Sequence, residues 1–362
     1  MPDTQGDFLI YGATGYTGEL IARRAAGAGM RPVLSGRNAS AIAGLAKELS
    51  LPHIAASVDD PASLDRAIDT IDGKNRLVLN CAGPFGRTAD QVSDACMRKS
   101  VHYLDITGEI NVFEMLARKG SRAKHMNVML LPGVGFDVVP SDCLAAYVAQ
   151  RLPAATNLVI AIYAGSRISR GTALTSIENM GLGGAVRKDG KIQRIPGAWK
   201  DRLVEFDKGP IRVTTMPWGD VATAWYSTGI PNIEVYMAIP AGMRRVLRYG
   251  RLAMPLISSK PVKMVLASRV KSGPPGPTAE QREKGRSRFW AEATEASGNS
   301  FAAKLYAPEG YELTVRTAIE CVFRTLNGMA TPGFQTPSRA FGAELIMSID
   351  GVRREDAQRN RR

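Results

Sequence analysis

The fold of this chain is decided by the run Phe8-Leu9-Ile10-Tyr11-Gly12-Ala13-Thr14-Gly15-Tyr16-Thr17-Gly18-Glu19-Leu20-Ile21. Four apolar residues predict a buried strand, and the apolar spacing that follows predicts a helix. The glycines between them follow the spacing G-x-x-G-x-x-G, a variant of the turn that holds a dinucleotide pyrophosphate at a helix N-terminus. A glycine-rich turn of ordinary purpose is the alternative, but the strand and helix around it are the context that nucleotide binding requires. We therefore predict that the pyrophosphate is bound by Gly12, Ala13, Thr14, Gly15, Tyr16, Thr17 and Gly18.

The first half of the chain alternates strand-like and helix-like segments. The expected strands are Phe8–Tyr11, Arg31–Ser35, His53–Ser57, Leu77–Cys81, Val101–Ile106 and Asn127–Leu131. The expected helices include Gly18–Ala28, Ser40–Leu49, Pro61–Thr70, Ala89–Lys99 and Ser141–Leu152. Such alternation predicts a parallel sheet with right-handed crossovers, which is an α/β fold of the doubly wound Rossmann type.

The second half reads as strands without crossover helices. The expected strands are Leu158–Ala164, Ala185–Arg194, Ile211–Thr215, Ala222–Ser227, Ile233–Ala238, Phe289–Ala296 and Phe301–Tyr306. Asp189-Gly190 and Ser297-Gly298-Asn299 are hairpin-turn signals, and Tyr311–Leu326 is expected to be helical. We expect a Rossmann domain over residues 1–152, a second α+β domain of mixed or antiparallel sheet over 153–331, and a C-terminal segment, 332–362, that packs back on the Rossmann domain.

Composition limits the class of protein. The chain has 362 residues, with 44% hydrophobic and 22% charged, as in water-soluble globular proteins. We see neither a secretory signal nor an apolar stretch that would span a bilayer, and the four cysteines lack metal-ligand spacing. We expect a cytoplasmic protein without a bound metal. The net charge of +13 favours acidic partners such as a phosphorylated cofactor, an acyl carrier or an anionic membrane, whereas no nucleic-acid module is visible. The basic tail from Arg353 to Arg362 reads as a frayed end.

The end of the second expected strand bears on the choice of cofactor. NAD-specific folds place an acid there for the ribose 2′-hydroxyl, whereas this chain has Ser35-Gly36-Arg37-Asn38. The guanidinium of Arg37 can hold a 2′-phosphate with two hydrogen bonds, although an exposed arginine at a strand end is the plain alternative. Ser35 and Asn38 would add hydrogen bonds. We expect Asp59 to contact the adenine end of the cofactor. An acid that caps the start of a helix, such as Asp60, would give a similar sequence pattern. We expect NADP(H) to be preferred over NAD(H).

Three further strand ends lie at the same predicted sheet edge, where open α/β sheets bind their ligands. Glycines there allow the backbone to approach a flat ring, although each one alone could serve only a turn. We expect the nicotinamide half of the cofactor to contact Ala82, Gly83, Pro84, Phe85, Gly133 and Gly135.

Few side chains qualify as a proton donor. Asp137 and Asp105 follow strands at this edge, and a buried carboxyl with a raised pKa can donate a proton. Each can equally accept hydrogen bonds from loop amides. For Asp137 the two roles are balanced, for Asp105 the structural one is favoured, and His102 reads as a packed strand residue.

The segment 242–271 carries only basic charges among large apolar residues. It is open to several interpretations: a basic amphipathic element on anionic lipid, a contact for an acyl carrier, a lid over an acyl chain, or helices that pack on their own sheet or on a second copy of the chain. Exposure of its apolar face would favour the membrane.

The motifs Gly12–Gly18, Asn80–Phe85, Tyr103–Glu109 and Gly135–Asp142 resemble those of the saccharopine dehydrogenase-like oxidoreductases, a family that includes trans-acting enoyl reductases of lipid metabolism. The resemblance extends more loosely through Gly171-Thr172 and Gly310-Tyr311 to Thr331–Phe334. It implies a Rossmann domain that binds NAD(P)H and a second α+β domain. The loop Gly135-Phe136-Asp137 departs from the amino-acid enzymes of the family, which argues against saccharopine as the substrate.

The sequence thus predicts an NADP(H)-dependent oxidoreductase that reduces a C=C (enoyl) or C=N bond of a small or lipid-linked substrate. The alternative is a protein without catalytic activity that senses NADP(H) or acts as a scaffold at a lipid surface.

Overall fold

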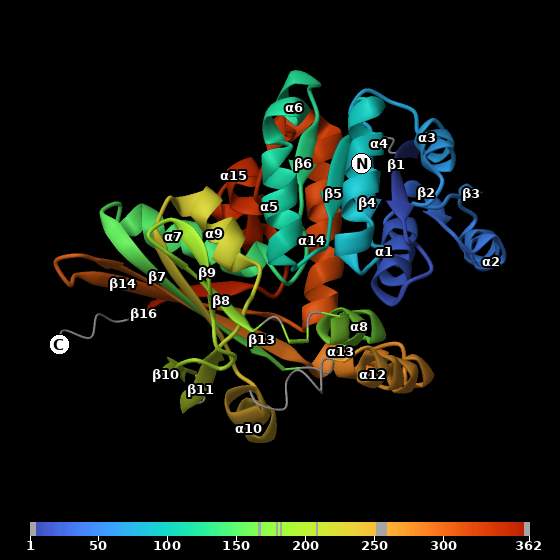
Figure 1. Ribbon diagram of the computed structural model, residues 1–362. Coiled ribbons are helices and arrows are strands. Elements are labelled where there is room, and N and C mark those ends of the chain that lie inside the picture. Colours follow the sequence, from blue (N-terminus) through green and yellow to red (C-terminus); the bar gives the residue numbers. More distant parts are fainter. Residues whose placement is uncertain are drawn as a thin grey trace. The chain divides into compact units, whose positions relative to one another are not determined.

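The computed structural model describes residues 5–165, 168–178, 180–181, 183–207, 209–250 and 259–357 (Figure 1). The chain divides into two compact units, each built from two stretches of sequence. The first unit comprises Met1–Asp137 and Leu313–Phe341, and the second comprises Val138–Glu312 and Gly342–Arg362.

A seven-stranded sheet forms the centre of the first unit, with the strand order β15-β6-β5-β4-β1-β2-β3. All its pairings are parallel. The strands are β1 (Gln5–Tyr11), β2 (Arg31–Gly36), β3 (His53–Ala55), β4 (Leu77–Asn80), β5 (His102–Asp105), β6 (Met129–Leu131) and β15 (Gly333–Phe334). The central strands are continuous apolar runs because helices bury both faces of a parallel sheet. Phe8, Leu9 and Ile10 of β1 are at most 1% exposed.

The helices of this unit follow the strands in chain order. They are α1 (Tyr16–Gly27), α2 (Ala39–Leu49), α3 (Pro61–Ile68), η1 (Phe85–Arg87), α4 (Ala89–Arg98), α5 (Ile110–Arg118), α6 (Gly120–His125), α14 (Gly310–Arg324, in this unit from Leu313), η3 (Thr325–Met329) and α15 (Pro337–Phe341). In Figure 1 the late helix α14, in orange, lies among the blue and teal elements of the N-terminal part.

A nine-stranded sheet forms the second unit. Its main order is β10-β11-β12-β7-β13-β14-β16, and β8 pairs with both β12 and β9. Among the strand pairs that the structure describes in this sheet, β7 with β12 is the parallel one, and the others are antiparallel. The strands are β7 (Ala155–Ala164), β8 (Gly184–Lys188), β9 (Lys191–Ile195), β10 (Asp201–Phe206), β11 (Gly209–Thr215), β12 (Asn232–Met237), β13 (Arg286–Glu295), β14 (Ser300–Pro308) and β16 (Arg353–Ala357). The helices are α7 (Val139–Arg151), α8 (Arg170–Glu178), α9 (Asp220–Thr228), α10 (Ala241–Tyr249), α12 (Lys260–Ser272), α13 (Ala279–Lys284) and η4 (Ala343–Ser348).

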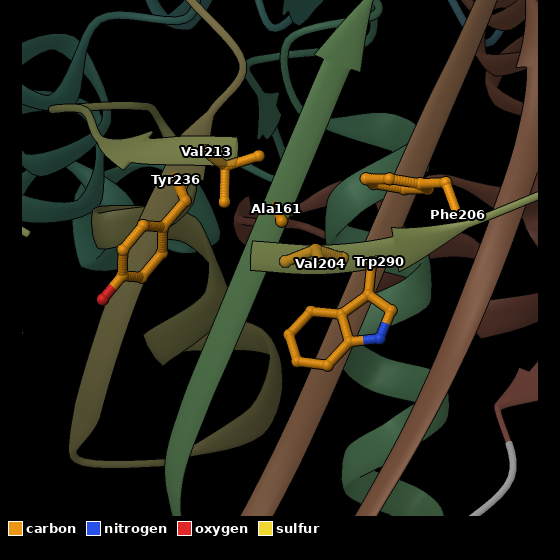
Figure 2. Packing of buried hydrophobic residues seen from close by; sticks show 6 residues of the cluster. All are labelled: Ala161, Val204, Phe206, Val213, Tyr236 and Trp290. Atoms are coloured by element: carbon orange, nitrogen blue, oxygen red, sulfur yellow. The ribbon is translucent and has the colours of Figure 1, made fainter. Parts of the chain in front are cut away.

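One face of this second sheet carries a core of its own, shown in Figure 2. Strand residues alternate between faces, so that Val204 and Phe206 of β10 point inward while Leu203 and Glu205 point outward. The inward residues meet Trp290 of β13. The cluster consists of Ala161, Val204, Phe206, Val213, Tyr236 and Trp290.

The predicted fold class is confirmed, since a parallel Rossmann-type sheet is combined with a second, mixed sheet. Within the described ranges, no helix is long and apolar enough to cross a bilayer. The observed units differ from the expected domain ranges. The chain leaves the first unit at Asp137 rather than at 152, and it returns with α14, because Thr314 and Thr317 bond the loop that follows β6.

Two local predictions were wrong, and one predicted hairpin was confirmed. The segment Ala222–Ser227 lies in helix α9, because its apolar residues pack on one helical face against α7 and β12. The segment Ala185–Arg194 is two strands, β8 and β9, which reverse at the predicted turn Asp189-Gly190. Part of the expected frayed tail, Arg353–Ala357, is the edge strand β16, which pairs with β14. The tail beyond Ala357 lies outside the described residues.

Candidate cofactor site

The turn between β1 and α1 is held by its own backbone. The N–H groups of Gly12 and Ala13 donate to the carbonyl oxygen of Ser35 on β2, over 2.8 and 3.0 Å, and Gly15 N–H donates to Gly12 O over 3.0 Å. Gly12 has a φ of +83°, which disfavours any residue with a side chain. The turn therefore has one shape, fixed before any ligand arrives.

Three segments of the chain pack together at this turn because Gly12 and Gly18 have no side chain. A Cβ on Gly12 would lie 2.7 Å from the backbone nitrogen of Ala82 after β4, and one on Gly18 would lie 2.3 Å from Gly12 O. Helix α1 thus packs directly against the turn, and the end of β4 packs against its other side. These contacts explain the first and third glycines of the motif.

The start of α1 suits an anion. Gly15 is the N-cap residue, and no side chain caps it within the described part of the chain. The amides of a first helical turn have no partner inside the helix, and the helix dipole adds a partial positive charge there. Thr14 and Gly15 are exposed, so this end of the helix faces solvent. A diphosphate fits such a terminus.

Arg37 lies immediately after β2 and is exposed. Its guanidinium makes no hydrogen bond or ion pair with any residue that the structure describes. Burial is the main cause that raises the pKa of the Tyr11 hydroxyl, and the charges of Arg37 and Asp59 act on the same hydroxyl in opposite directions. Arg37 and Asp59 therefore both lie near the end of β1, beside the turn.

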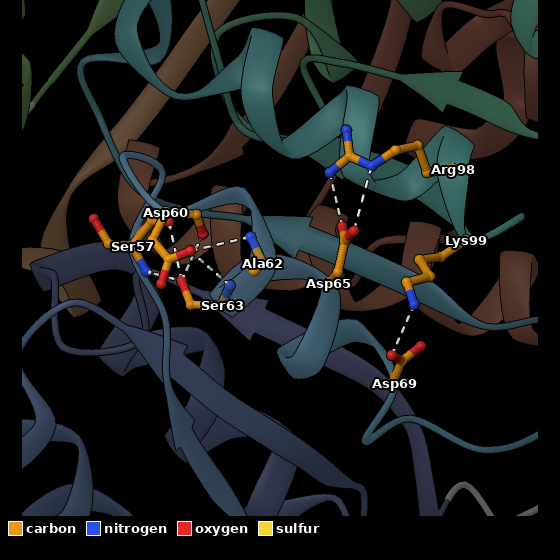
Figure 3. Close-up of polar contacts among 8 residues, drawn as sticks. All are labelled: Ser57, Asp60, Ala62, Ser63, Asp65, Asp69, Arg98 and Lys99. Carbon is orange, nitrogen blue, oxygen red and sulfur yellow. Dashed lines mark hydrogen bonds and ion pairs between the residues drawn. The ribbon is translucent and has the colours of Figure 1, made fainter.

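The neighbours of Arg37 differ in what they can offer a ligand. Ser35 is fully buried and supports the turn through its carbonyl oxygen, and its Oγ has no partner among the described residues. Asn38 caps α2 by accepting from Ala41 N–H over 3.1 Å. Asp60 caps α3 by accepting from the amides of Ala62 and Ser63, as Figure 3 shows. The acid at the start of that helix is therefore Asp60, and Asp59 stays exposed beside it.

A buried polar network ties together the ends of β4, β5 and β6. Asn80 Nδ2 donates to Thr88 Oγ1 and to the Tyr103 hydroxyl, both over 3.2 Å. The Tyr103 hydroxyl donates to Asp105 Oδ2 over 2.7 Å. Asp105 Oδ1 accepts the amides of Thr107 and Gly133 over 2.9 and 3.0 Å. Asp105 thus orients the loops at the sheet edge.

Glu109 is a residue of this edge that sequence reasoning missed. Its carboxylate accepts the backbone amides of Phe85, over 2.8 Å, and Gly86, over 3.3 Å. These contacts hold the loop Ala82–Phe85, whose Gly83–Pro84 peptide bond is cis, to the loop after β5. The sequence signal for Glu109 is an acid two residues after a threonine at a strand end. In the structure, Thr107 Oγ1 accepts the Glu109 amide and so positions this residue.

The glycines after β6 have structural reasons of their own. Gly133 has a φ of +76° and donates its amide to Asp105. A Cβ on Gly135 would lie 2.9 Å from the Thr314 methyl carbon, so this glycine makes room for helix α14. Both residues are buried. Any contact of theirs with a nicotinamide ring therefore remains a prediction.

The two acids weighed as proton donors are in different settings. Asp105 is fully buried and has three hydrogen-bond donors, and burial raises its pKa to about 6. Asp137 packs on Gly108, where a Cβ would lie 2.6 Å from its carboxylate oxygen, and burial raises the pKa of Asp137 to about 7. His102 accepts the Met129 amide at Nδ1, and burial lowers its pKa, as suits a packed neutral imidazole.

A second polar cluster lies in the second unit, and none of its residues was predicted to belong to a site. The Tyr311 hydroxyl accepts the Ser169 amide over 2.5 Å and lies 3.2 Å from Thr172 Oγ1. The two loosely matching motifs, Gly171-Thr172 and Gly310-Tyr311, thus meet through their hydroxyl groups. Among the described residues, no group of three or more His, Cys, Asp and Glu side chains is arranged to hold a metal.

Comparisons with known proteins find matches to the same part of the chain. Residues 8–131 match the family model of the saccharopine dehydrogenase NADP binding domain. A probable mitochondrial saccharopine dehydrogenase-like oxidoreductase of Arabidopsis thaliana is 30% identical over 158 residues, which cover 39% of this chain and 34% of that protein. A trans-acting enoyl reductase of Mycobacterium bovis is 29% identical over 148 residues, which cover 38% of this chain and 34% of that protein.

The similarity of fold extends further than the similarity of sequence. The structure is similar to that of the apo saccharopine dehydrogenase (L-Glu forming) of Saccharomyces cerevisiae, with a TM-score of 0.65 and 11% sequence identity. The superposition covers 97% of this chain and 99% of the yeast chain. At that identity the likeness concerns the fold alone.

The parallel sheet and the glycine turn define the class, which is that of proteins with a dinucleotide-binding Rossmann domain. Within that class, residues 8–131 are similar to the saccharopine dehydrogenase NADP binding domain, and the resemblance seen in the sequence is confirmed. The matched part spans about a third of the length of the two curated relatives.

Proposed function

We propose that this chain is an NADP(H)-dependent oxidoreductase that reduces a C=C (enoyl) or C=N bond of a small or lipid-linked substrate. One observation carries the proposal. An exposed arginine without a partner among the described residues, Arg37, lies beside a helix N-terminus that no described side chain caps. An uncapped helix start and an exposed guanidinium suit a diphosphate and a 2′-phosphate, which NADP(H) carries together and NAD(H) does not.

Each proposed contact has its own support. The amides at the start of α1 would hold the diphosphate, and the absence of side chains at Gly12, Gly15 and Gly18 would let it approach. Arg37 would hold the 2′-phosphate, with Asn38 and Asp59 at its rim. Ser35 would act through the turn that its carbonyl oxygen supports rather than by direct contact, because its hydroxyl is buried.

The reduction requires a hydride and a proton. The bound NADPH would supply the hydride to one atom of the double bond, and the other atom would take a proton. Asp137 suits the second task, since a carboxyl with a pKa near 7 is partly protonated at neutral pH. Asp105 is engaged by three donors and serves the loops around it.

The names of the relatives support two chemical classes of substrate. One relative is named a trans-acting enoyl reductase and another a saccharopine dehydrogenase-like oxidoreductase, so an enoyl C=C and an imine C=N are the two bonds to try. The departure of the Gly135-Phe136-Asp137 loop from the amino-acid enzymes favours the enoyl substrate.

The test is a reductase assay that follows the absorbance of reduced nicotinamide. The purified chain would be given NADPH with an α,β-unsaturated acyl thioester, or with an amino acid and a keto acid that form an imine. Oxidation of NADPH in either arm supports the proposal. Tight binding of NADPH with no turnover in both arms would favour a protein that senses the cofactor.

A further inference from the structure

Helix α10 bears an unusual surface. Its inner side holds Arg244, Leu247 and Arg248, which are partly buried, while Met243 and Val246 on its outer side are 49% and 54% exposed. Tyr249 at its end is 76% exposed. Large apolar side chains at this exposure, spaced along one helical face, are costly unless something covers them.

Arg248 attaches the helix to the hairpin of β10 and β11. Its guanidinium forms two hydrogen bonds with the Asp201 carboxylate, over 2.8 and 3.0 Å, and two with Ala198 O, over 2.8 and 3.0 Å. Burial acts to raise the pKa of Asp201, but the hydrogen bonds from Arg248 and Thr214 and the charges of nearby arginines together hold it below its usual value. The bonds from Arg248 hold one side of α10 against the hairpin, so the opposite side of the helix faces outward.

The contact leaves a basic pocket. A shallow cavity of about 240 Å³ is lined by Asp201, Arg212, Arg244, Arg245, Arg248 and Tyr249. The distances from Arg212 Nη1 and Arg244 Nε to Asp201 Oδ2 are longer, 3.8 and 3.9 Å. Asp201 is the one acid among the lining residues and balances one of the four arginines, so the pocket has an excess of positive charge that favours an anion.

Exposed apolar side chains lie on the segments that line this pocket. Leu203 is 60% exposed and lies opposite Arg212 in the β10–β11 ladder. Trp199, 43% exposed, follows the residue that accepts from Arg248. We call these two residues, with Met243, Val246 and Tyr249, the α10 patch. A basic helix with apolar and aromatic side chains on its outer face is the pattern of elements that lie in a membrane interface.

We propose that the α10 patch docks this protein on an anionic lipid bilayer, with a headgroup phosphate in the arginine pocket and the apolar side chains at the boundary of the acyl chains. Charge complementarity selects this occupant, because arginines beside a bilayer gain from its anionic lipids. A protein partner suits the patch less well, since arginines interrupt its apolar residues, whereas the cores of protein interfaces are depleted in charge.

The test is flotation of the full chain with vesicles of phosphatidylcholine alone or with added phosphatidylglycerol. We expect wild type to float only with the anionic vesicles, and less of it as salt is raised. Arg245→Glu and Val246→Asp should each weaken partitioning roughly tenfold. Arg245 is exposed and Val246 faces outward, so both variants should keep the wild-type circular dichroism and melting temperature.

Lys188→Glu is the matched control. Lys188 is exposed at the end of β8, in the same unit, and the substitution changes the net charge as Arg245→Glu does. It should bind vesicles like wild type. The proposal is overturned if wild type ignores anionic vesicles, or if Lys188→Glu weakens binding as much as Arg245→Glu. It is also overturned if Val246→Asp turns a dimer into a monomer by light scattering without changing flotation, since the occupant is then a second copy of the chain.

Discussion

A carboxyl group at the sheet edge can donate a proton to a substrate or accept hydrogen bonds from the loops around it. The sequence places Asp105 and Asp137 at the ends of neighbouring strands, where both are candidate proton donors. The contacts give Asp105 a structural role, because it accepts from Tyr103, Thr107 and Gly133. Burial raises the pKa of both carboxyls, that of Asp105 to about 6 and that of Asp137 to about 7. Periodicity and spacing carry no information on such partners, since these come from segments far apart in the chain.

Asp105 should make stability depend on pH in a known direction. Its pKa is raised from 3.8 to about 6 in the folded chain, so the folded state holds the proton more tightly than the unfolded one. The contribution to stability is therefore complete below about pH 4 and is lost as pH rises through 6. We expect the free energy of unfolding of wild type, relative to Asp105→Asn, to fall by up to about 1.4 kcal/mol per pH unit in this window. Urea denaturation at several pH values measures it, and parallel curves for the two proteins would contradict the assignment.

Asp137 should control turnover if it is the proton donor of the proposed reaction. A donor with a pKa near 7 loses its proton above neutral pH, so kcat should fall there. Asp137→Asn should lower kcat by roughly a hundredfold or more and abolish that fall, with little change in NADPH affinity. The pH profile of kcat for both proteins is the measurement. An unchanged profile in the variant would assign the proton to another group or to solvent.

At the scale of elements, the strand–turn–helix unit was the most predictable part. An apolar strand, three glycines and an amphipathic helix identify β1, the turn and α1 from local sequence alone. The segment Ala222–Ser227 was misread because its small and aromatic residues fit both periods, and packing against α7 makes it helical. The strand β10 was missed because polar residues alternate along it and only Val204 and Phe206 mark its buried face.

The packing of α1 on the turn can be tested with two glycines of the same helix. Gly18→Ala would place a methyl 2.3 Å from Gly12 O, which should cost about 1–3 kcal/mol of stability and weaken NADPH binding. Gly27→Ala is the control, since nothing lies within 4 Å of its Cβ, and it should stabilise the chain by about 0.4–1 kcal/mol. Thermal unfolding with and without NADPH compares them. Equal melting temperatures for the two variants would refute close packing at Gly18.

At the scale of the whole molecule, a compact unit need not be one continuous stretch of sequence. The change of pattern along the chain predicts a domain boundary near residue 152, whereas the first unit ends at Asp137 and also includes Leu313–Phe341. Thr314 accepts the Phe136 amide, and Thr317 donates to Val134 O. Such a return depends on contacts that bridge more than 170 residues, which a reading of local pattern does not detect.

This division of the chain predicts how fragments behave. A fragment of residues 1–152 lacks α14 and β15, so the loop after β6 loses its support and we expect no cooperative unfolding transition. Joining residues 1–137 to 313–341 with a flexible linker should restore a cooperative transition and NADPH binding. Circular dichroism during urea denaturation reports both. Cooperative folding of the 1–152 fragment alone would show that α14 is dispensable.

The central claim is that the first unit binds NADP(H) through the start of α1 and Arg37. Isothermal titration of the full chain with NADPH and NADH tests it most directly, on wild type, Arg37→Ala and the control Arg31→Ala, which removes an exposed arginine from the other end of β2. We predict that wild type and Arg31→Ala bind NADPH roughly 10–100-fold more tightly than NADH, and that Arg37→Ala loses this preference. Equal affinity of wild type for both cofactors, or binding of neither, would contradict the claim.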